Sequence, residues 1–289
     1  MRRFCKLLLW IAAPLAASAL LFGAAPVATL NAIASVDGPG PVRSVAYGPL
    51  ARQQLDVYRP GGIAPAAGWP AVVFFSGGSW NRGERADCRF VGAALASRGL
   101  LTLVADYRLY PEVRYPGFLH DCALATSYGL RHAAALGGDP RRVFLMGHSA
   151  GAYNAAMIAL DPRWLAARGR RNLELAGWIG LAGPYDFLPM RNLEAQPVFF
   201  HPDYPAGSQP IEHATAGTPR ALLVAASADI LVDPQRNSVG LAARLRAAGV
   251  PVQLQLHERV DHVTLLAAIA APLRWLAPVL DGVVSFIDA

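Results

Sequence analysis

Residues 143–157 constrain the fold more than any other stretch of the sequence. They begin as a short apolar run typical of a buried strand, pass through Gly-His-Ser-Ala-Gly, and continue as an alanine-rich run typical of a helix. A strand, a sharp turn and a helix around Gly-x-Ser-x-Gly predict a nucleophile elbow, with Ser149 exposed at the strand end. Gly147 and Gly151 are needed there because a Cβ would collide with the neighbouring strand or helix. The alternative is a glycine-flanked serine in an ordinary loop. The elbow is favoured only if a base, an acid and an oxyanion hole lie where it would need them.

The alternation of strand-like and helix-like segments predicts an α/β fold. Besides the strand leading into the elbow, predicted strands cover residues 42–47, 53–58, 71–75, 101–105, 178–181, 220–227 and 252–256. Predicted helices cover residues 87–98, 118–136, 235–248 and 264–286, the last broken at Pro272. After an initial antiparallel hairpin, this rhythm predicts a mostly parallel sheet of about eight strands with helices on both faces. Active sites in such sheets lie at the carboxyl ends of the strands.

Three residues that each follow a predicted strand form a candidate catalytic triad: Ser149, Asp229 and His262. A serine hydroxyl is a poor nucleophile until a base removes its proton. A histidine can do so near neutral pH, and a carboxylate can hold its ring and stabilise the imidazolium. The chemistry therefore needs all three residues together.

Other acidic and histidine residues compete for these roles. Asp233 lies close to Asp229, but the adjacent Pro234 suggests a helix start, where a carboxylate serves as a cap. His257 is a weaker alternative base than His262. We interpret Asp106 and Arg108 as structural charges that hold the loop after the strand at 101–105.

A pair of glycines directly follows the predicted strand at residues 71–75. Two glycines at a strand end allow main-chain N–H groups to face a cleft without side chains in the way. We therefore predict that the N–H groups of Gly77, Gly78 and Ala150 form an oxyanion hole. An ordinary strand-end turn is the alternative reading of this glycine pair.

Residues 183–219 have no clear periodicity and predict a short irregular roof over the site. Aromatic side chains near the predicted strand ends are candidates for lining an apolar substrate pocket. They are Trp80, Tyr153, Tyr185 and Phe187, together with Phe199 and Phe200.

Taken together, these motifs resemble those of bacterial α/β-hydrolases of the carboxylesterase type, close to the hormone-sensitive-lipase-like and feruloyl-esterase-like (BD-FAE) groups. The resemblance extends from about residue 42 to the C-terminus. It implies an α/β-hydrolase fold and ester hydrolysis through an acyl-enzyme intermediate, with no cofactor and no metal. One departure is clear: the family's usual His-Gly-Gly-Gly reads Ser-Gly-Gly-Ser at residues 76–79. The residues that carry the resemblance are Gly77-Gly78-Ser79-Trp80, Asp106-Tyr107-Arg108-Leu109 with Pro111 and Pro116, Gly138-Asp139-Pro140, Gly147-His148-Ser149-Ala150-Gly151, Asp229 with Val232, and Asp261-His262.

Three functions remain compatible with the sequence. The first is a serine carboxylesterase for small or aromatic acyl esters; the short roof argues against a lipase that needs an oil interface. An arylformamidase or another amidase would use the same triad. A non-catalytic, membrane-tethered binding protein that keeps the fold is the third, and a missing triad member would favour it.

Composition excludes some partners and supports a single large domain. The chain has 289 residues, of which 54% are hydrophobic and 16% charged, which favours one packed core over disorder. The net charge is +6, but Lys6 is the only lysine and no basic run interleaved with aromatics occurs. Composition therefore argues against nucleic acid as a partner, and a small-molecule ester is the partner that the family resemblance implies.

The N-terminus has the layout of an export signal. Arg2, Arg3 and Lys6 precede an apolar run at residues 7–22, which Pro14 interrupts. We predict a signal peptide or an uncleaved signal anchor at residues 1–35 and the catalytic domain at residues 36–289. The catalytic domain would then be periplasmic or tethered to the inner membrane facing the periplasm.

Two cysteines, Cys88 and Cys122, remain after the predicted leader. In an oxidising compartment they could form a disulfide, and two buried free thiols are the alternative. Neither lies in a metal-binding pattern such as Cys-x-x-Cys or His-Glu-x-x-His.

Overall fold

The computed structural model describes residue 31 and residues 40–289. The predicted leader at residues 1–35 lies outside the described residues, apart from Asn31. Across the part of the chain that is described, no helix combines the length and apolar character needed to cross a bilayer.

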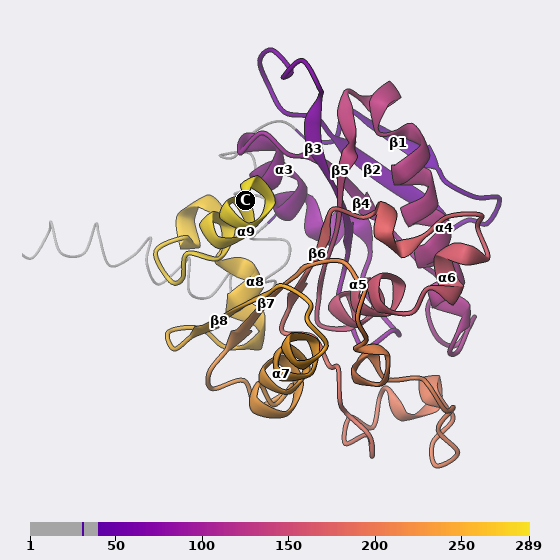
Figure 1. The fold of residues 1–289 in the computed structure, drawn as a ribbon. Coiled ribbons are helices and arrows are strands. Elements are labelled where there is room, and N and C mark those ends of the chain that lie inside the picture. Colours follow the sequence, from indigo (N-terminus) through magenta and orange to yellow (C-terminus); the bar gives the residue numbers. More distant parts are fainter. Residues whose placement is uncertain (1–30, 32–39) are drawn as a thin grey trace, which may run out of the picture.

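One sheet of eight strands runs through the described domain, in the order β1-β2-β4-β3-β5-β6-β7-β8 (Figure 1). Strands β1 and β2 pair antiparallel, as do β2 and β4, and all other pairs are parallel. The predicted mostly parallel sheet of about eight strands is therefore confirmed. The strands are β1 (Arg43–Ala46), β2 (Gln54–Tyr58), β3 (Trp69–Phe75), β4 (Leu101–Ala105), β5 (Gly138–His148), β6 (Gly177–Leu181), β7 (Ala221–Ala226) and β8 (Val252–His257).

Helices cover both faces of the sheet because its central strands are apolar on both sides. Helices α4, α5, α6 and α7 pack on one face, and α3, α8 and α9 pack on the other. The helices are α3 (Arg89–Ser97), α4 (Gly117–His132), α5 (Ala150–Leu160), α6 (Arg163–Ala166), α7 (Gly240–Ala247), α8 (His262–Ala267) and α9 (Val279–Asp288). Short 3-10 helices occur at Arg85–Cys88, Ala134–Leu136, Asn172–Glu174, Gln196–Phe199, Pro210–His213 and Ala271–Leu273, and a π-helix at Gln235–Val239.

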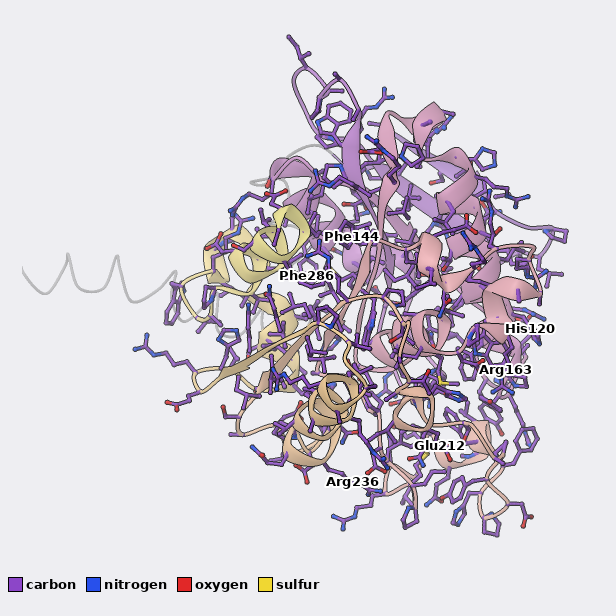
Figure 2. All side chains as sticks on the ribbon, viewed as in Figure 1. His120, Phe144, Arg163, Glu212, Arg236 and Phe286 are labelled. Carbon is purple, nitrogen blue, oxygen red and sulfur yellow. The ribbon has the colours of Figure 1, made fainter. Side chains whose placement is uncertain are left out.

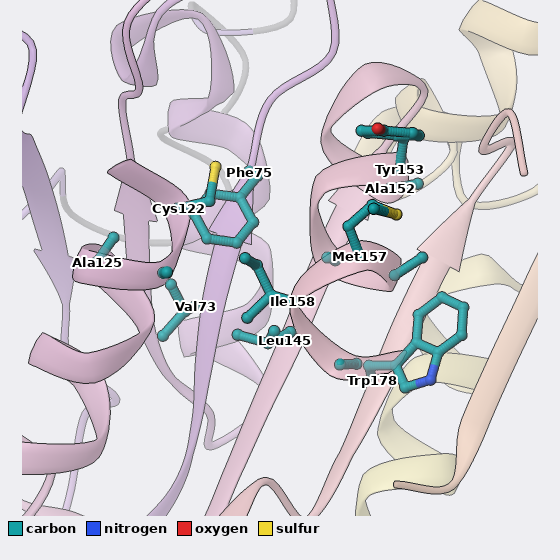
Figure 3. Close-up of a cluster of buried hydrophobic side chains, with 14 of the residues drawn as sticks. Val73, Phe75, Cys122, Ala125, Leu145, Ala152, Tyr153, Met157, Ile158 and Trp178 are labelled. Atoms are coloured by element: carbon teal, nitrogen blue, oxygen red, sulfur yellow. The ribbon is translucent and has the colours of Figure 1, made fainter. Parts of the chain in front are cut away.

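The larger core lies between the sheet and helices α4 and α5, as Figure 3 shows. Side chains of alternate residues in β3 and β5 point to this face, which follows from the two-residue period of a strand. The labelled members are Val73, Phe75, Cys122, Ala125, Leu145, Ala152, Tyr153, Met157, Ile158 and Trp178. This packing holds α5, and with it the elbow, firmly against the sheet.

On the other face, α9 closes the core with an aromatic pair that Figure 2 labels. The rings of Phe144 and Phe286 lie 6.2 Å apart. The guanidinium of Arg220 lies 4.5 Å from the ring centre of Phe286 and 5.5 Å from that of Phe144. The C-terminal helix is thus attached directly to the elbow strand β5.

The break predicted at Pro272 in the closing helix is present, but the bounds of the two parts differ from the predicted residues 264–286. Helix α8 begins earlier, at His262, and α9 begins only at Val279. Pro272 and Pro278 lack an N–H donor, so no regular helix continues through the segment between them.

The two cysteines are free and buried, so the disulfide reading is wrong. Cys88 packs in the core on the α3 side of the sheet, whereas Cys122 of α4 packs in the core on the opposite side. Burial raises the pKa of both thiols well above the ordinary value. The sheet between them prevents a bridge.

The segment 183–219 is irregular, as predicted, and contains two of the short 3-10 helices. It lies at the carboxyl ends of the strands, the same end at which Figure 2 labels Arg236. The side-chain oxygen of Asn237 accepts hydrogen bonds from the N–H groups of Tyr185 and Asp186, at 2.6 and 2.9 Å. Arg236 forms an ion pair with Asp186 at 2.8 Å. The π-helix after β7 therefore holds the roof in place.

Candidate active site

The predicted elbow is present between β5 and α5. Ser149 has φ +53° and ψ −121°, a strained conformation for a residue with a side chain. A Cβ added to Gly147 would lie 2.1 Å from the carbonyl oxygen of Gly151. A Cβ added to Gly151 would lie 2.0 Å from the carbonyl oxygen of Phe75. Both glycines are thus required for the close approach of helix and strand.

The structure brings the three candidate triad residues together. Ser149 Oγ donates to His262 Nε2 at 2.9 Å, and His262 Nδ1 donates to Asp229 Oδ2 at 2.7 Å. Asp229 and His262 are both buried, while Ser149 is partly exposed. This chain of hydrogen bonds runs from a carboxylate through an imidazole to a hydroxyl, the arrangement that activates a serine.

Asp229 is held as a carboxylate. Burial alone would raise its pKa, but the hydrogen bond and charge of His262 act against burial. The N–H groups of Leu231 and Val232 add to this effect, each donating to Asp229 Oδ1 at 2.9 Å. The pKa of Asp229 lies below its ordinary value as a result.

The competing residues have other roles. Asp233 Oδ1 accepts from the N–H groups of Gln235 and Arg236, at 2.9 and 3.3 Å, and so caps the π-helix. His257 Nε2 is buried and makes no hydrogen bond within the described residues. Asp106 pairs with Arg85, and Arg108 pairs with Asp121 at 2.8 Å, so both charges hold loops.

His262 lies in the first turn of α8, whereas the predicted helix begins only at residue 264. Asp261 caps this helix and accepts hydrogen bonds from the N–H groups of Val263 and Thr264, at 3.0 and 2.8 Å. Thr264 Oγ1 accepts from the N–H of Asp261 at 2.8 Å, which completes a capping box. The imidazole of His262 is therefore carried by a fixed helix end.

His148, the residue before the nucleophile, was not predicted to contribute. Its Nε2 donates to the main-chain oxygen of His262 at 2.9 Å, so the ring carries its proton on Nε2. Burial and the nearby His262 lower the pKa of His148 to about 3, which keeps it neutral. His148 thus joins the elbow to the start of α8. Its place inside the Gly-x-Ser-x-Gly pattern is the only sequence signal for this role.

The buried His148 predicts a specific pH dependence of stability. In the unfolded chain a histidine binds a proton below about pH 6.5, but folded His148 does so only near pH 3. The contribution of neutral His148 to the free energy of unfolding is therefore complete above pH 6.5 and is lost as the pH falls toward 3. Between pH 6.5 and 5 we expect the wild type to lose about 2 kcal/mol more unfolding free energy than His148→Gln. Urea unfolding at both pH values measures this difference; equal losses in the two proteins would contradict it.

The predicted oxyanion hole lies beside the elbow. A Cβ on Gly77 would lie 3.0 Å from Ser149 Cβ, which places the glycine turn next to the nucleophile. Within the described residues, the N–H groups of Gly77, Gly78 and Ala150 make no hydrogen bond, so they are free to bind an oxyanion. Ala150 lines the cavity over the site, and so does Ser79, which directly follows the predicted glycine pair.

Ser79 is one of the two positions, with Ser76, at which this chain departs from the family pattern. Ser79 and Trp80 have φ values of +52° and +57°, a region that disfavours side chains. The hydroxyl of Ser79 accepts a hydrogen bond from Asn192 Nδ2 of the roof at 3.0 Å. Asn192 Oδ1 in turn accepts from the N–H of Glu194 at 3.1 Å. A roof side chain therefore supports the strained turn.

We expect Asn192→Ala to lower kcat about fivefold, because one hydrogen bond that holds residues 77–79, here named the oxyanion turn, is lost. Glycine adopts positive φ without strain, so Ser79→Gly in the same chain should restore most of the loss. Steady-state kinetics on both variants checks this. A double variant no faster than Asn192→Ala would contradict the supporting role.

A cavity of about 610 Å³ opens above Ser149 and His262. Of the predicted pocket residues, Trp80 and Phe187 line it. Tyr153 and Tyr185 do not, and this part of the prediction is wrong. Tyr153 is buried below Trp80, with ring centres 5.1 Å apart, and Tyr185 is buried against Trp178. Phe199 and Phe200 also lie outside the lining.

The lining comes mainly from three segments: the oxyanion turn, the roof and the loop after β7. Its members are Ser79, Trp80, Arg82, Ser149, Ala150, Pro184, Asp186, Phe187, Pro189, Met190, Arg191, Asn192, Leu193, Glu194, Ala195, Ile230, Leu231, Val232, Asp233, Arg236, Asn237 and His262. No group of three or more potential metal ligands occurs among the described residues.

Comparison with known families agrees with this geometry. The sequence profile of the BD-FAE family matches residues 55–245. The chain belongs to the BD-FAE family. The match includes the oxyanion turn, Ser149 and Asp229, while His262 lies beyond its end.

Curated relatives of this BD-FAE member are named as esterases. A probable isoprenylcysteine alpha-carbonyl methylesterase of Arabidopsis thaliana is 29% identical over 271 residues, 86% of this chain and 63% of that protein. Esterase LipC of Mycobacterium tuberculosis is 29% identical over 223 residues, 71% of this chain and 55% of that protein. The chain thus spans less than two thirds of the length of these relatives.

Solved structures show the same α/β-hydrolase fold. Esterase 2 of Thermogutta terrifontis phosphoramylated by tabun has a TM-score of 0.66 at 25% identity, covering 78% of this chain and 85% of that one. The butyrate-bound form has a TM-score of 0.71 at 22% identity, covering 86% and 94%. The predicted fold class is confirmed.

Proposed function

We propose that the protein is a serine carboxylesterase that cleaves carboxylic esters through an acyl-enzyme intermediate. The observation that carries the proposal is the hydrogen-bonded chain of Asp229, His262 and Ser149 at the end of β5. The names of the relatives support esters as the substrate class. The structural neighbour also supports a reactive nucleophile, because it is phosphoramylated by tabun and phosphorylated by paraoxon.

The first half-reaction forms the acyl-enzyme. His262 Nε2 accepts the proton of Ser149 Oγ as the oxygen attacks the ester carbonyl, and Asp229 stabilises the resulting imidazolium. The negative oxygen of the tetrahedral intermediate is bound by the N–H of Ala150 and by those of the turn at residues 77–79. His262 then donates its proton to the departing alcohol, and the acyl group stays on Ser149.

Water completes the cycle. It loses a proton to His262 as it attacks the acyl carbonyl, and the same N–H groups bind the second oxyanion. The proton returns to Ser149 Oγ when the carboxylic acid leaves. The main-chain bond from His148 to His262 keeps the start of α8 in place throughout.

Labelling and turnover together test the proposal. The full-length protein should react with a fluorophosphonate, and peptide mass spectrometry should find the label on Ser149. It should hydrolyse p-nitrophenyl acetate and butyrate faster than p-nitroacetanilide. Faster anilide or formamide cleavage would indicate an amidase. The absence of both labelling and turnover would indicate a binding protein.

We also propose that residues 1–35 direct export of the catalytic domain. The basic residues before an uncharged apolar run support this proposal. A fusion of residues 1–40 to alkaline phosphatase, which is active only after export, tests it. An inactive fusion would refute the proposal, and membrane fractionation would separate a cleaved leader from an anchor.

A further inference from the structure

The mouth of the cavity carries an unusual set of exposed apolar side chains. Leu193, Ile230 and Leu231 are 74%, 94% and 68% exposed, and all three line the cavity. Single exposed apolar residues are common on protein surfaces. A group of them at the rim of one concave site indicates a binding surface. We name these three residues the apolar mouth.

One side of the apolar mouth belongs to the turn that also positions the catalytic acid. Asp229 Oδ1 accepts hydrogen bonds from the N–H groups of Leu231 and Val232. These bonds fix the backbone of the turn, so the side chains of Ile230 and Leu231 are presented at a defined place next to the triad. The side chains of Ile230 and Leu231 are therefore exposed on an ordered turn.

The other side belongs to the roof and is held equally firmly. Leu193 lies between Asn192, which bonds to Ser79, and Glu194, which pairs with Arg82 at 2.5 Å. The main-chain oxygen of Glu194 also accepts from Asn81 Nδ2 at 3.4 Å. Asn192 is therefore tied to the turn at residues 77–79, and Glu194 to the residues that directly follow it. The apolar mouth thus has two fixed sides that belong to segments far apart in the sequence.

The charges around the mouth are largely compensated. Arg82 pairs with Glu194, and Arg236 pairs with Asp186 at 2.8 Å. Asp233 is occupied in capping the π-helix. Arg191 lines the cavity without an ion pair among the described residues. This balance favours a neutral, apolar group over a highly charged one.

We propose that the apolar mouth is a subsite for a long hydrocarbon chain of the ester, which extends out of the cavity from the carbonyl bound at Ser149. This inference rests on the proposed esterase function and names its preferred substrate class. The continuity between the mouth and the catalytic cavity identifies the occupant as part of the substrate. The chain can belong to the acyl group or to the alcohol, and the experiment distinguishes the two.

The test measures kcat/KM against chain length, below the micelle concentration of each ester. One series lengthens the acyl group of p-nitrophenyl esters from acetyl to decanoyl, and the other lengthens the alcohol of alkyl acetates. Complete burial of one methylene corresponds to about fourfold in affinity, so an open mouth should give about twofold per methylene. We expect this rise in one series once the chain reaches the mouth.

The variant Leu193→Ser/Ile230→Ser, which leaves the Asp229 donor Leu231 unchanged, should flatten most of that rise while acetate esters are hydrolysed at the wild-type rate. Ile63→Ser/Leu173→Ser is the matched control, because both residues are exposed and lie outside the cavity lining. It should retain the full chain-length dependence. Leu193→Ser alone leaves the whole loop after β7 unchanged and should halve the effect, so the proposal remains testable if the double variant fails to fold.

Three outcomes would overturn the subsite. They are a flat profile in the wild type, an unchanged slope in the Leu193→Ser variant, or an equal loss for acetate and long esters. If the unchanged slope is accompanied by weaker binding of the Leu193→Ser variant to phosphatidylcholine vesicles, the mouth is assigned to a membrane surface instead. A wild type with neither labelling nor ester turnover would refute the proposed function itself, which is a separate result.

Discussion

Replacing Ser149 by alanine should lower kcat by roughly 10⁴- to 10⁶-fold and leave KM almost unchanged. The substitution removes the hydroxyl oxygen, which is the atom that would form a covalent bond to the substrate. The cavity that binds the ester is preserved. His262 and Asp229 then have no nucleophile to activate. The remaining turnover would come from the oxyanion turn and from binding alone. Steady-state kinetics with p-nitrophenyl butyrate measures the loss of turnover, and fluorophosphonate labelling measures the loss of the reactive serine.

The control for Ser149→Ala is Ser97→Ala. Ser97 donates to the main-chain oxygen of Ala94 at the end of α3, away from the cavity lining. This variant should keep wild-type labelling and turnover. Persistent labelling of Ser149→Ala would show that another side chain is the nucleophile.

Replacing Asp229 by asparagine should lower kcat by about 10³- to 10⁴-fold, with a smaller change in KM. The amide has nearly the same shape but no charge, so the imidazolium that forms during attack is no longer stabilised. Its N–H₂ group can also face His262 Nδ1 and favour the wrong tautomer. The pKa of Asp229 lies below its ordinary value, so the carboxylate is the form that acts at neutral pH.

Asp233→Asn is the matched comparison for Asp229→Asn. Asp233 lies four residues away and caps the π-helix, a role that asparagine fills equally well. Its kcat should stay within about twofold of the wild type. Reversed results for the two variants would transfer the acid role to Asp233.

Much of the candidate site could be predicted because its parts follow local rules. Gly147 and Gly151 are required by the elbow itself, and Asp229 and His262 follow strands whose ends meet at one edge of the sheet. A parallel sheet converts sequence order into spatial proximity. The position of His262 in a helix was missed because the capping box of Asp261 and Thr264 starts the helix two residues before the predicted start at residue 264.

The roof and the pocket could not be predicted in the same way. The bond between Asn192 and Ser79 joins residues 113 positions apart, and no periodicity constrains the irregular segment that carries Asn192. Tyr153 illustrates the difficulty within a regular helix. Its aromatic ring suits a pocket, but α5 turns it into the core, where its hydroxyl donates to the main-chain oxygen of Ser208 at 2.6 Å.

The separation of Cys88 and Cys122 by the sheet has a practical consequence. The domain can reach its native state under reducing or oxidising conditions alike, since these thiols cannot pair with each other in the folded protein. Each thiol reacts only when its own layer of helices opens, because burial disfavours the thiolate. Alkylation rates at the two positions, resolved by peptide mapping, would therefore report separately on the breathing of the two halves of the molecule.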